Sequence, residues 1–372
     1  MPKNLTYSDV GVDVGIEAKA ARILYHAAQK TWENRKGMLG EIEVKQDSFS
    51  GRRFFRVDSL PVGTISNGNS DGLGLKPEIA IMAKRFDTLA FDLMAMICDD
   101  AAIQGGEPVA VQTVLVVNTL GKNEARLRYI RELAKGYIKA AKEACVVVIN
   151  GEIAQHPSLV DKKKFSLDWN GSVVWYAHES RLIDGRNIRP GDLLVGLKEK
   201  GPRCNGTSLL LKSLEKLHGE NWSNKSYNRK RLVDLALRPS KIYTPAILEM
   251  TGGWSLDRPA RAQLHGAAHI TGGGIPEKLG RALRPSGYGA IVDDPFNPSD
   301  LMLHCQNAGI SDDEAYRAWN MGQGMVLIAP VAEDIIQIAQ EFGINAKVIG
   351  RVTEAPGITI YSKGLQQEEI HY

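Results

Sequence analysis

The chain has few cysteines, and they are widely spaced. Only four occur among 372 residues, Cys98, Cys145, Cys204 and Cys305, and no pair has the Cys-x-x-Cys spacing of common zinc and redox motifs. Two of them lie in apolar runs, where a free thiol behaves as a small hydrophobic group. The cysteines therefore argue against a disulfide framework and against a structural zinc site.

A large excess of charge and a long hydrophobic run are also missing. The net charge is +3, and the basic residues form no extended cluster of the kind that binds nucleic acid. No run approaches the ~18 consecutive apolar residues of a membrane helix, and the first residues lack the apolar core of a signal peptide. We therefore expect a cytoplasmic protein with no nucleic-acid partner and no membrane partner.

The length and the pattern of apolar runs predict two domains. A chain of 372 residues exceeds the size at which one hydrophobic core usually stops growing. The segment 179–191 is polar and rich in turn residues, so we place a boundary there and predict domains 1–180 and 181–372. Apolar strands and amphipathic helices follow one another in both halves, which indicates an α+β fold.

The segment 65–108 combines acidic and apolar residues, and the rest of the chain is interpreted around it. Residues 89–103 are apolar nearly all round, as in a buried helix, yet they include Asp92, Asp99 and Asp100. Asp92 and Asp99 are seven residues apart, about 20° from eclipsed on a helix. Because a buried carboxylate is costly without a partner, these acids require either cations or a wet cleft.

A fourth acid, Asp71, lies in a glycine-rich stretch before that helix. Mg²⁺ is the simplest cation for such carboxylates, and it usually bridges to substrate phosphates. Gly72 and Gly74 lack a Cβ, so the backbone there can approach a phosphate, and Lys76 can meet its charge. An ordinary β-turn followed by a core helix explains the same residues equally well.

Two further acids accompany predicted strands. The runs Val109–Val117 and Ala144–Ile149 have the composition of buried strands, and Glu152 follows the second one. Ligands often bind at strand ends in α/β sheets, so Glu152 is a candidate metal ligand, with a simple turn residue as the alternative. Asp168 opens the strand Gly171–Ala177 and has the same two interpretations.

The segment His269–Gly274 is the clearest pattern in the second half. Three glycines, Gly272 to Gly274, lead into a predicted helix that has Pro276 in its first turn. This arrangement leaves backbone N–H groups open at a helix N-terminus, where anions bind. A flexible glycine hinge is the alternative interpretation.

Taken together, these motifs resemble the phosphoribosylformylglycinamidine cyclo-ligase family, also called aminoimidazole ribonucleotide synthetases. The resemblance covers nearly the whole chain, and the order and spacing of the motifs agree with it. The matching segments are Tyr7–Asp13, Asp71–Gly74, Asp87–Met96, Gln104–Pro108, Gly151–Glu152, Asn205–Gly206, Ile242–Tyr243, His269–Gly274 and Asn320–Met325.

The resemblance implies a fold, a reaction and an assembly. It implies an N-terminal domain that forms a β-barrel across a homodimer and a C-terminal α/β sandwich domain that completes the cleft. The implied reaction is the ATP-dependent cyclisation of formylglycinamidine ribonucleotide to aminoimidazole ribonucleotide in purine biosynthesis, with release of ADP and phosphate. The implied partners are ATP, Mg²⁺ and a small ribonucleotide substrate.

The resemblance also implies roles for individual residues. By position, the Mg²⁺ ligands are Asp71, Asp100 and Glu152. The residues around ATP are Gly72, Gly74, Lys76, Asp87 and Asp168. The substrate pocket is formed by Asn205, His269, Thr271, Gly272, Gly273, Gly274 and Asn320. The residues expected to act in catalysis are Lys76, Asp100, Asn205 and His269.

Several residues depart from the family pattern near these sites. Leu75 replaces a threonine of the phosphate loop, and Asp99 replaces the asparagine of an Asn-Asp pair. Asn150 replaces a glycine, and Arg203 replaces the histidine of a Gly-Pro-His-Ser-Asn-Gly motif. Two alternatives therefore stay open: an ATP-dependent enzyme of the same superfamily that phosphorylates a different acceptor, and a catalytically silent nucleotide-binding scaffold.

Overall fold

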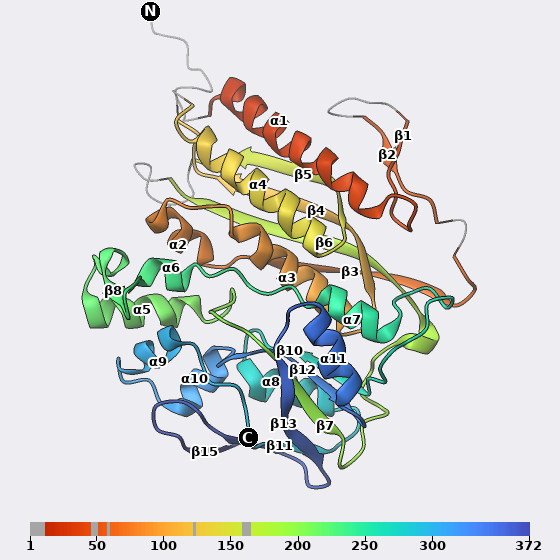
Figure 1. Cartoon of the computed structure of the whole chain (residues 1–372). Coiled ribbons are helices and arrows are strands. Elements are labelled where there is room, and N and C mark those ends of the chain that lie inside the picture. The colour runs from red at the N-terminus through yellow and green to blue at the C-terminus, as the bar shows by residue number, and fades with distance from the viewer. Residues whose placement is uncertain (1–11, 46–50, 58–59, 122–123, 158–164) are drawn as a thin grey trace, which may run out of the picture. The chain divides into compact units, whose positions relative to one another are not determined.

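Two large sheets contain most of the strands in the described part of the chain (Figure 1). The computed structural model describes residues 12–45, 51–57, 60–121, 124–157 and 165–372, so residues 7–11 of the Tyr7–Asp13 motif lie outside the described part. The chain divides into two compact units. Unit 1 comprises Met1–Leu60, Asn67–Ile97 and Pro108–Trp175, and unit 2 comprises Pro61–Ser66, Cys98–Glu107 and Tyr176–Tyr372. The domain boundary at 180/181 stays a prediction.

A four-stranded sheet in the order β3-β6-β4-β5 forms the centre of unit 1, and its strands β4 and β5 are parallel. The elements in this part of the chain are α1 (Val14–Thr31), η2 (Trp32–Arg35), β1 (Glu43–Val44), β2 (Arg53–Phe54), β3 (Thr64–Gly72), α2 (Lys76–Ala83), α3 (Leu89–Ala102), β4 (Glu107–Val117), α4 (Leu127–Glu143), β5 (Val147–Gln155) and β6 (Leu167–His178). The sheet is open among the described residues, and the β-barrel across a homodimer stays a prediction.

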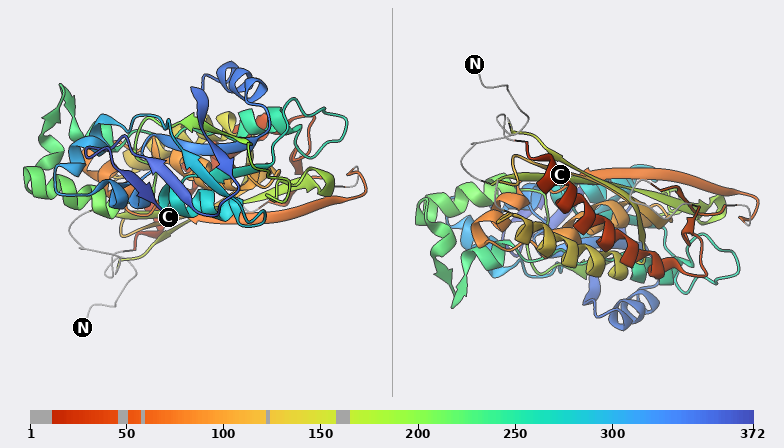
Figure 2. Two further views of the ribbon diagram at one scale, coloured as in Figure 1. Left: turned by 90° about the horizontal axis from the view of Figure 1, so that it is seen from below. Right: turned by 90° about the horizontal axis from the view of Figure 1, so that it is seen from above.

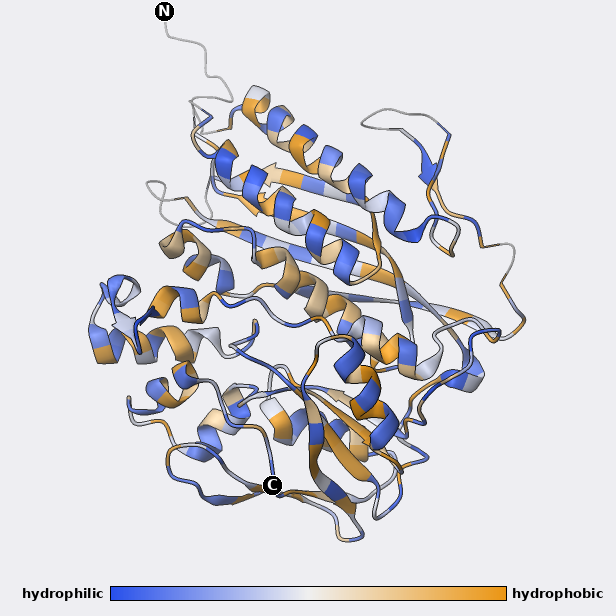
Figure 3. Cartoon of the chain, in the orientation of Figure 1, coloured by the Kyte–Doolittle hydropathy of each residue, from blue (hydrophilic) through white to orange (hydrophobic). Residues whose placement is uncertain are grey.

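Helices α1 and α4 lie side by side next to this sheet (Figures 1 and 2). In α4, Leu127, Ile130, Leu133 and Tyr137 recur at helical spacing and are buried. Figure 3 shows hydrophobic and hydrophilic residues alternating along this helix, as expected when one face is buried and the other is exposed. Hydrophobic burial along one face is therefore what holds α4 in place.

A seven-stranded mixed sheet in the order β10-β12-β7-β13-β11-β14-β15 forms the centre of unit 2, and β11 and β14 are its parallel pair. The elements that follow β6 are η3 (Glu179–Arg181), β7 (Leu193–Lys198), α5 (Thr207–His218), η4 (Trp222–Asn224), β8 (Ser226–Tyr227), β9 (Lys230–Arg231), α6 (Leu232–Ala236), α7 (Thr244–Thr251), β10 (Gly266–His269), α8 (Gly274–Leu283), β11 (Gly289–Val292), α9 (Asp300–Gln306), α10 (Asp312–Ala318), β12 (Gln323–Ala329), α11 (Glu333–Glu341), β13 (Ala346–Thr353), β14 (Ile358–Tyr361) and β15 (Glu369–His371).

The core of unit 2 lies between this sheet and the helices α7 and α11. Val195 of β7, Leu327 of β12, Ile247 of α7 and Ile335 of α11 are all fully buried in one cluster. The predicted two-domain fold of helices and strands is thus confirmed at this level, and the structure adds that its sheets are mixed.

The segment before α3 differs from the prediction in one respect. Residues 64–72 form the strand β3, so Asp71 and Gly72 end a strand and do not belong to a long glycine-rich loop. Only residues 73–75 separate this strand from α2, which has Pro77 in its first turn. Hydrogen bonding between strands therefore fixes the backbone at Asp71 and Gly72.

A substitution at Gly136 tests how closely α4 packs against the backbone of Asp87. An alanine in place of a helical glycine usually stabilises a helix by about 1 kcal/mol. At position 136, however, a Cβ would lie 2.2 Å from the carbonyl oxygen of Asp87. We expect Gly136→Ala to lower the free energy of unfolding by about 1–3 kcal/mol, measured by urea denaturation.

Gly280 of α8 supplies the control for this experiment. A Cβ there would have its nearest neighbour at 3.6 Å, which is ordinary van der Waals contact. Gly280→Ala is therefore expected to raise the free energy of unfolding by up to about 1 kcal/mol. Stabilisation by both substitutions would contradict the close contact between α4 and Asp87.

Candidate active site

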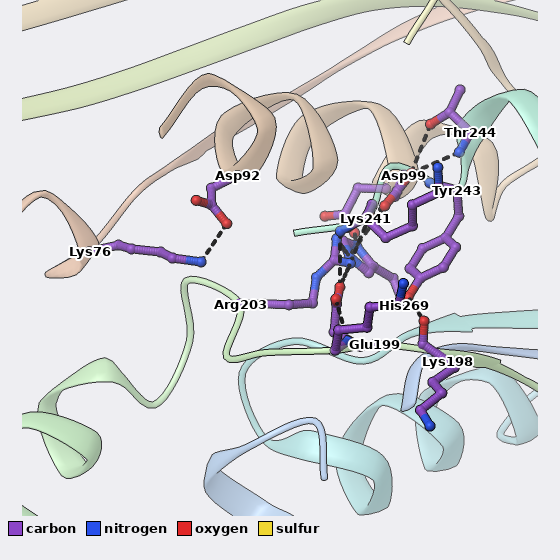
Figure 4. Close-up of polar contacts among 12 residues, drawn as sticks. Lys76, Asp92, Asp99, Lys198, Glu199, Arg203, Lys241, Tyr243, Thr244 and His269 are labelled. Atoms are coloured by element: carbon purple, nitrogen blue, oxygen red, sulfur yellow. Dashed lines mark hydrogen bonds and ion pairs between the residues drawn. The ribbon is translucent and has the colours of Figure 1, made fainter. Parts of the chain in front are cut away.

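Two buried acids of helix α3 form ion pairs with basic side chains of the protein. The carboxylates of Asp92 and Asp99 are both 0% exposed. Lys76 Nζ lies 2.6 Å from Asp92 Oδ1, and Arg203 Nη2 lies 3.0 Å from Asp99 Oδ2 (Figure 4). These two buried acids are therefore neutralised by the protein itself, as the cost of burying a charge requires.

Asp99 is also bonded to the start of α7. Its Oδ1 accepts hydrogen bonds of 2.9 Å from the backbone N–H groups of Tyr243 and Thr244 and from the Thr244 hydroxyl. A carboxylate is favoured at this position because the first N–H groups of a helix have no partner within the helix. Asp99 thus has a fixed place in unit 2.

Arg203 is the centre of a buried network in unit 2. Its Nη1 donates to Glu199 Oε2 at 3.0 Å and to the carbonyl of Lys241 at 3.1 Å. Its Nη2 donates to Asp99 and lies 2.7 Å from His269 Nε2. Burial alone would lower the pKa of Arg203, but the charges of Glu199 and Asp99 raise it above its usual value, so the guanidinium stays charged.

His269 connects this network to Asp100. The distance from His269 Nδ1 to Asp100 Oδ1 is 2.6 Å, and the Asp100 side chain is 35% exposed whereas that of His269 is 1% exposed. Burial raises the pKa of Asp100, but the hydrogen bond from His269 and the charges of Arg203 and Lys278 lower it below its ordinary value. Asp100 is therefore an ionised carboxylate near neutral pH.

Asp100 and His269 face a cavity in unit 2. The cavity has a volume of about 170 Å³, and Gln104, Thr271, Lys278 and Arg281 also line it. Both signs of charge are thus present on its wall, and the two basic residues both come from α8. This combination suits a ligand that carries both a cation and an anionic group.

The glycines before α8 take the predicted place at its N-terminus. Gly273 caps the helix with φ +85°, and Gly274 begins it with φ +62°. A Cβ on Gly274 would lie 1.8 Å from the carbonyl oxygen of Tyr316, so packing also requires this glycine. Gly272 has no positive φ, and its nearest neighbour would be the Asn205 amide nitrogen at 3.3 Å.

Asn205, Thr271 and Asn320 come together around a narrow crevice in unit 2. The Asn320 side chain bonds to the backbone of Gly201 and Gly322, at 2.9 Å in each case, which fixes its orientation. Asn205 Oδ1 is buried and has no hydrogen-bond partner among the described residues. An unsatisfied buried acceptor of this kind is costly, and a ligand with an N–H or O–H group would relieve it.

The predicted nucleotide residues of unit 1 occupy several different environments. Asp168 of β6 accepts a hydrogen bond of 2.9 Å from Asn170, whose side chain also fills the place of a Cβ on Gly72. Asp87 is exposed and pairs with Arg85 at 2.9 Å. Lys76 is fully buried against Asp92. Gly72 and Asp168 therefore both lie against the Asn170 side chain, and Lys76 is held inside unit 1.

Glu152 borders a separate cavity in unit 1. This cavity has a volume of about 230 Å³, and Tyr25, Trp32 and Arg53 also line it. The Arg53 guanidinium lies over the rings of Tyr25 and Trp32, 4.8 Å and 5.7 Å from their centres. Within the described ranges, no three His, Cys, Asp or Glu side chains gather in a way that could hold a metal ion by themselves.

Two family models match this chain. The one described as "AIR synthase related protein, N-terminal domain" matches residues 68–174, and the one described as "AIR synthase related protein, C-terminal domain" matches residues 189–363. A protein from Pyrococcus furiosus named phosphoribosylformylglycinamidine cyclo-ligase is 32% identical over 97% of this chain and 99% of its own length. The chain belongs to the phosphoribosylformylglycinamidine cyclo-ligase family. The predicted family is thus confirmed.

Other cyclo-ligases show a similar likeness. The one from Thermococcus kodakarensis is 30% identical over 97% of this chain and 99% of its own length. The one from Methanocaldococcus jannaschii is 30% identical over 94% of this chain and 93% of its own length. This member of the family therefore matches its relatives across both units.

Solved structures share the fold at low sequence identity. A thiamine-monophosphate kinase from Stenotrophomonas maltophilia has a TM-score of 0.58 at 14% identity and covers 90% of this chain and 95% of its own. A hydrogenase maturation protein, HypE, in complex with ATP has a TM-score of 0.57 at 16% identity and covers 94% of this chain and 92% of its own. These likenesses show the fold alone.

Three functional candidates were missed by the sequence analysis. Arg203 was noted only as a departure from the cyclo-ligase pattern, and Lys278 and Gln104 were not singled out. Arg203 could have been suspected, because a second departure, Asp99, adds a carboxylate that needs a positive partner. Lys278 lies four residues after Gly274, so its position near the start of the helix that follows the glycines could have been inferred from the sequence.

Lys76 gives a direct test of the buried pairs. Lys76→Met removes the ammonium that faces Asp92, and breaking such a pair typically costs about 3–5 kcal/mol. We expect the free energy of unfolding to fall by that order in urea. The double variant Lys76→Met/Asp92→Asn should regain much of the loss, because it removes both charges. Unfolding of Lys76→Met at the wild-type midpoint would contradict the structural pairing.

Proposed function

We propose that this chain catalyses the ATP-dependent cyclisation of formylglycinamidine ribonucleotide to aminoimidazole ribonucleotide, with release of ADP and phosphate. The observation that carries the proposal is the likeness to a named cyclo-ligase at 32% identity over 97% of the chain and 99% of that relative. The enzyme is accordingly a ligase of purine biosynthesis.

The reaction requires charge stabilisation more than a protein nucleophile. The γ-phosphoryl group of ATP is transferred to the amide oxygen of the substrate, so an O–P bond forms and ADP leaves. An internal nitrogen then attacks the activated carbon, the imidazole ring closes, and phosphate leaves with that oxygen. Positioned cations and N–H donors stabilise such transfers. In unit 2, Lys278 and Arg281 of α8 line the cavity and offer such cations.

Asp71, Asp100 and Glu152 would hold Mg²⁺ in this proposal. Asp100 fits this role because it is ionised and 35% exposed. Mg²⁺ commonly takes only one or two carboxylates and completes its shell with water and phosphate oxygens, so a ready-made cage of three acids is not required. When bound, the ion would neutralise charge on the ATP phosphates.

The remaining residues complete the proposed substrate sites. Gly72, Gly74, Lys76, Asp87 and Asp168 are the proposed surroundings of ATP. Asn205, His269, Thr271, Gly272, Gly273, Gly274 and Asn320 are the proposed substrate pocket, and the unsatisfied Asn205 Oδ1 supports a ligand there. The homodimer, its β-barrel and the cytoplasmic location belong to the same proposal. Among the described residues, no helix has the length and hydrophobicity needed to cross a bilayer.

ADP release tests the reaction. The purified protein with MgATP should release ADP only when formylglycinamidine ribonucleotide is added, and one aminoimidazole ribonucleotide should form for each ADP. Thiamine monophosphate serves as the control acceptor. Equal ADP release with both acceptors would favour the superfamily alternative, and no release with either would favour the silent scaffold.

Asp100 tests the metal site. We expect Asp100→Ala to abolish Mg²⁺-dependent turnover and to leave the dimer folded, because the partly exposed side chain is not part of the core. Turnover against Mg²⁺ concentration and the thermal midpoint are the two measurements. Asp293→Ala is the matched control, since Asp293 is an exposed acid paired with Arg351 at 3.1 Å. An active Asp100→Ala enzyme would remove Asp100 from the proposed metal ligands.

A further inference from the structure

The contact between Arg203 and His269 constrains where the imidazole proton lies. Arg203 Nη2 is 2.7 Å from His269 Nε2, and both side chains are almost fully buried. A guanidinium has N–H donors and no acceptor, so Nε2 must accept this hydrogen bond. The ring proton therefore lies on Nδ1, the nitrogen that is 2.6 Å from Asp100 Oδ1.

We propose that Arg203 is a positioning residue that fixes the ring proton of His269 on Nδ1 and thereby directs His269 to hold the Asp100 carboxylate. His269 then acts on the orientation of Asp100 and donates no proton through Nε2. The importance of this arrangement for turnover rests on the proposed function, whereas the position of the proton does not.

The surroundings of Arg203 hold it in the orientation that this role requires. Asp99 Oδ2 and Glu199 Oε2 each accept from the guanidinium at 3.0 Å, from different sides. Asp99 is itself held by three donors at the start of α7, and Glu199 accepts from the backbone N–H groups of Lys200 and Lys241. Figure 4 shows the Arg203 side chain reaching into this group of acids beside His269.

The same geometry connects the two departures from the family pattern. Arg203 introduces a buried positive charge, and Asp99 introduces the carboxylate that faces it. Either change alone would bury a charge without that partner, which is costly. The two residues are paired in the structure, and Arg203 also contacts His269, so the pair lies directly beside the His269 ring.

The hydrogen bond from His269 fixes the orientation of the Asp100 carboxylate. Asp100 Oδ1 lies 2.6 Å from His269 Nδ1, and the Asp100 side chain is 35% exposed. Asp100 lines the cavity together with Lys278. A carboxylate held by one oxygen presents the other in a fixed direction, as supporting residues do for metal ligands.

The position of the proton can be read from the ring nitrogens. In ¹⁵N-histidine-labelled wild-type protein without substrate, two-bond ¹H–¹⁵N spectra should show His269 with a protonated Nδ1 and an unprotonated Nε2. The spectrum of His269→Asn identifies its signals among the eight histidines. A wild-type ring protonated on Nε2 would overturn the proposal without any test of stability or turnover.

Variants at position 203 test the cause. Arg203→Met leaves both Asp99 and Glu199 without the guanidinium and is at risk of misfolding. The double variant Asp99→Asn/Arg203→Met, in which only the Glu199 carboxylate loses this cation, is therefore measured beside it. In both, Nε2 loses its donor, and the His269 nitrogen signals should shift away from the wild-type pattern. Arg203→Lys keeps a donor and should restore that pattern at least in part. Unchanged nitrogen signals in the double variant would overturn the assignment.

Arg35 provides the matched control. It is also a buried arginine, 1% exposed, and it donates to the carbonyls of Leu39 and Cys145 in unit 1. Arg35→Lys should leave the His269 signals unchanged. Turnover in the ADP-release assay should fall at least about tenfold in the folded Asp99→Asn/Arg203→Met variant. A wild-type protein with the expected proton position and no cyclisation would reject the proposed function and keep the positioning role.

Discussion

The buried ion pair between Asp99 and Arg203 sets the arrangement of the candidate active site in unit 2. A carboxylate with no exposed surface is tolerable only when donors surround it, and Asp99 has four of them. Those donors bring together the end of α3, the segment after β7 and the start of α7. The charge therefore determines which backbone segments meet beside the cavity.

Near the start of α3, in unit 1, a second buried carboxylate also requires a positively charged partner. Asp92 faces the ammonium of Lys76, and both side chains are inaccessible to water. A helix that is otherwise apolar thus carries one neutralised acid near its start and another near its end. Asp100 differs, because it is partly exposed and its hydrogen-bond partner is a histidine. That difference separates the acid suited to meet a ligand from the two that stabilise the fold.

Local patterns in the sequence predicted the secondary structure around the site, but they did not predict which distant residues pair there. The apolar residues of 89–103 predicted the helix, and the cost of burying acids predicted that cations were needed. The glycines of 272–274 predicted the start of α8.

The partners of the buried acids could not be identified from local patterns, because Arg203 lies 104 residues from Asp99 and His269 lies 169 residues from Asp100. Such pairings depend on tertiary folding, and the periodicity and turn propensity of the sequence carry no information about it. Lys76 shows the same limit, since its charge suited a phosphate as well as a buried acid.

The three glycines at the start of α8 differ in how strictly the fold requires them. Gly273 and Gly274 both have positive φ, and a Cβ on Gly274 would also collide with the Tyr316 carbonyl, so the fold itself requires glycine at these two positions. Gly272 is under no such demand, and only the amide of Asn205 limits its replacement. The backbone therefore restricts a side chain less at position 272 than at positions 273 and 274, and the limit at 272 comes from a neighbour in the crevice around Asn205.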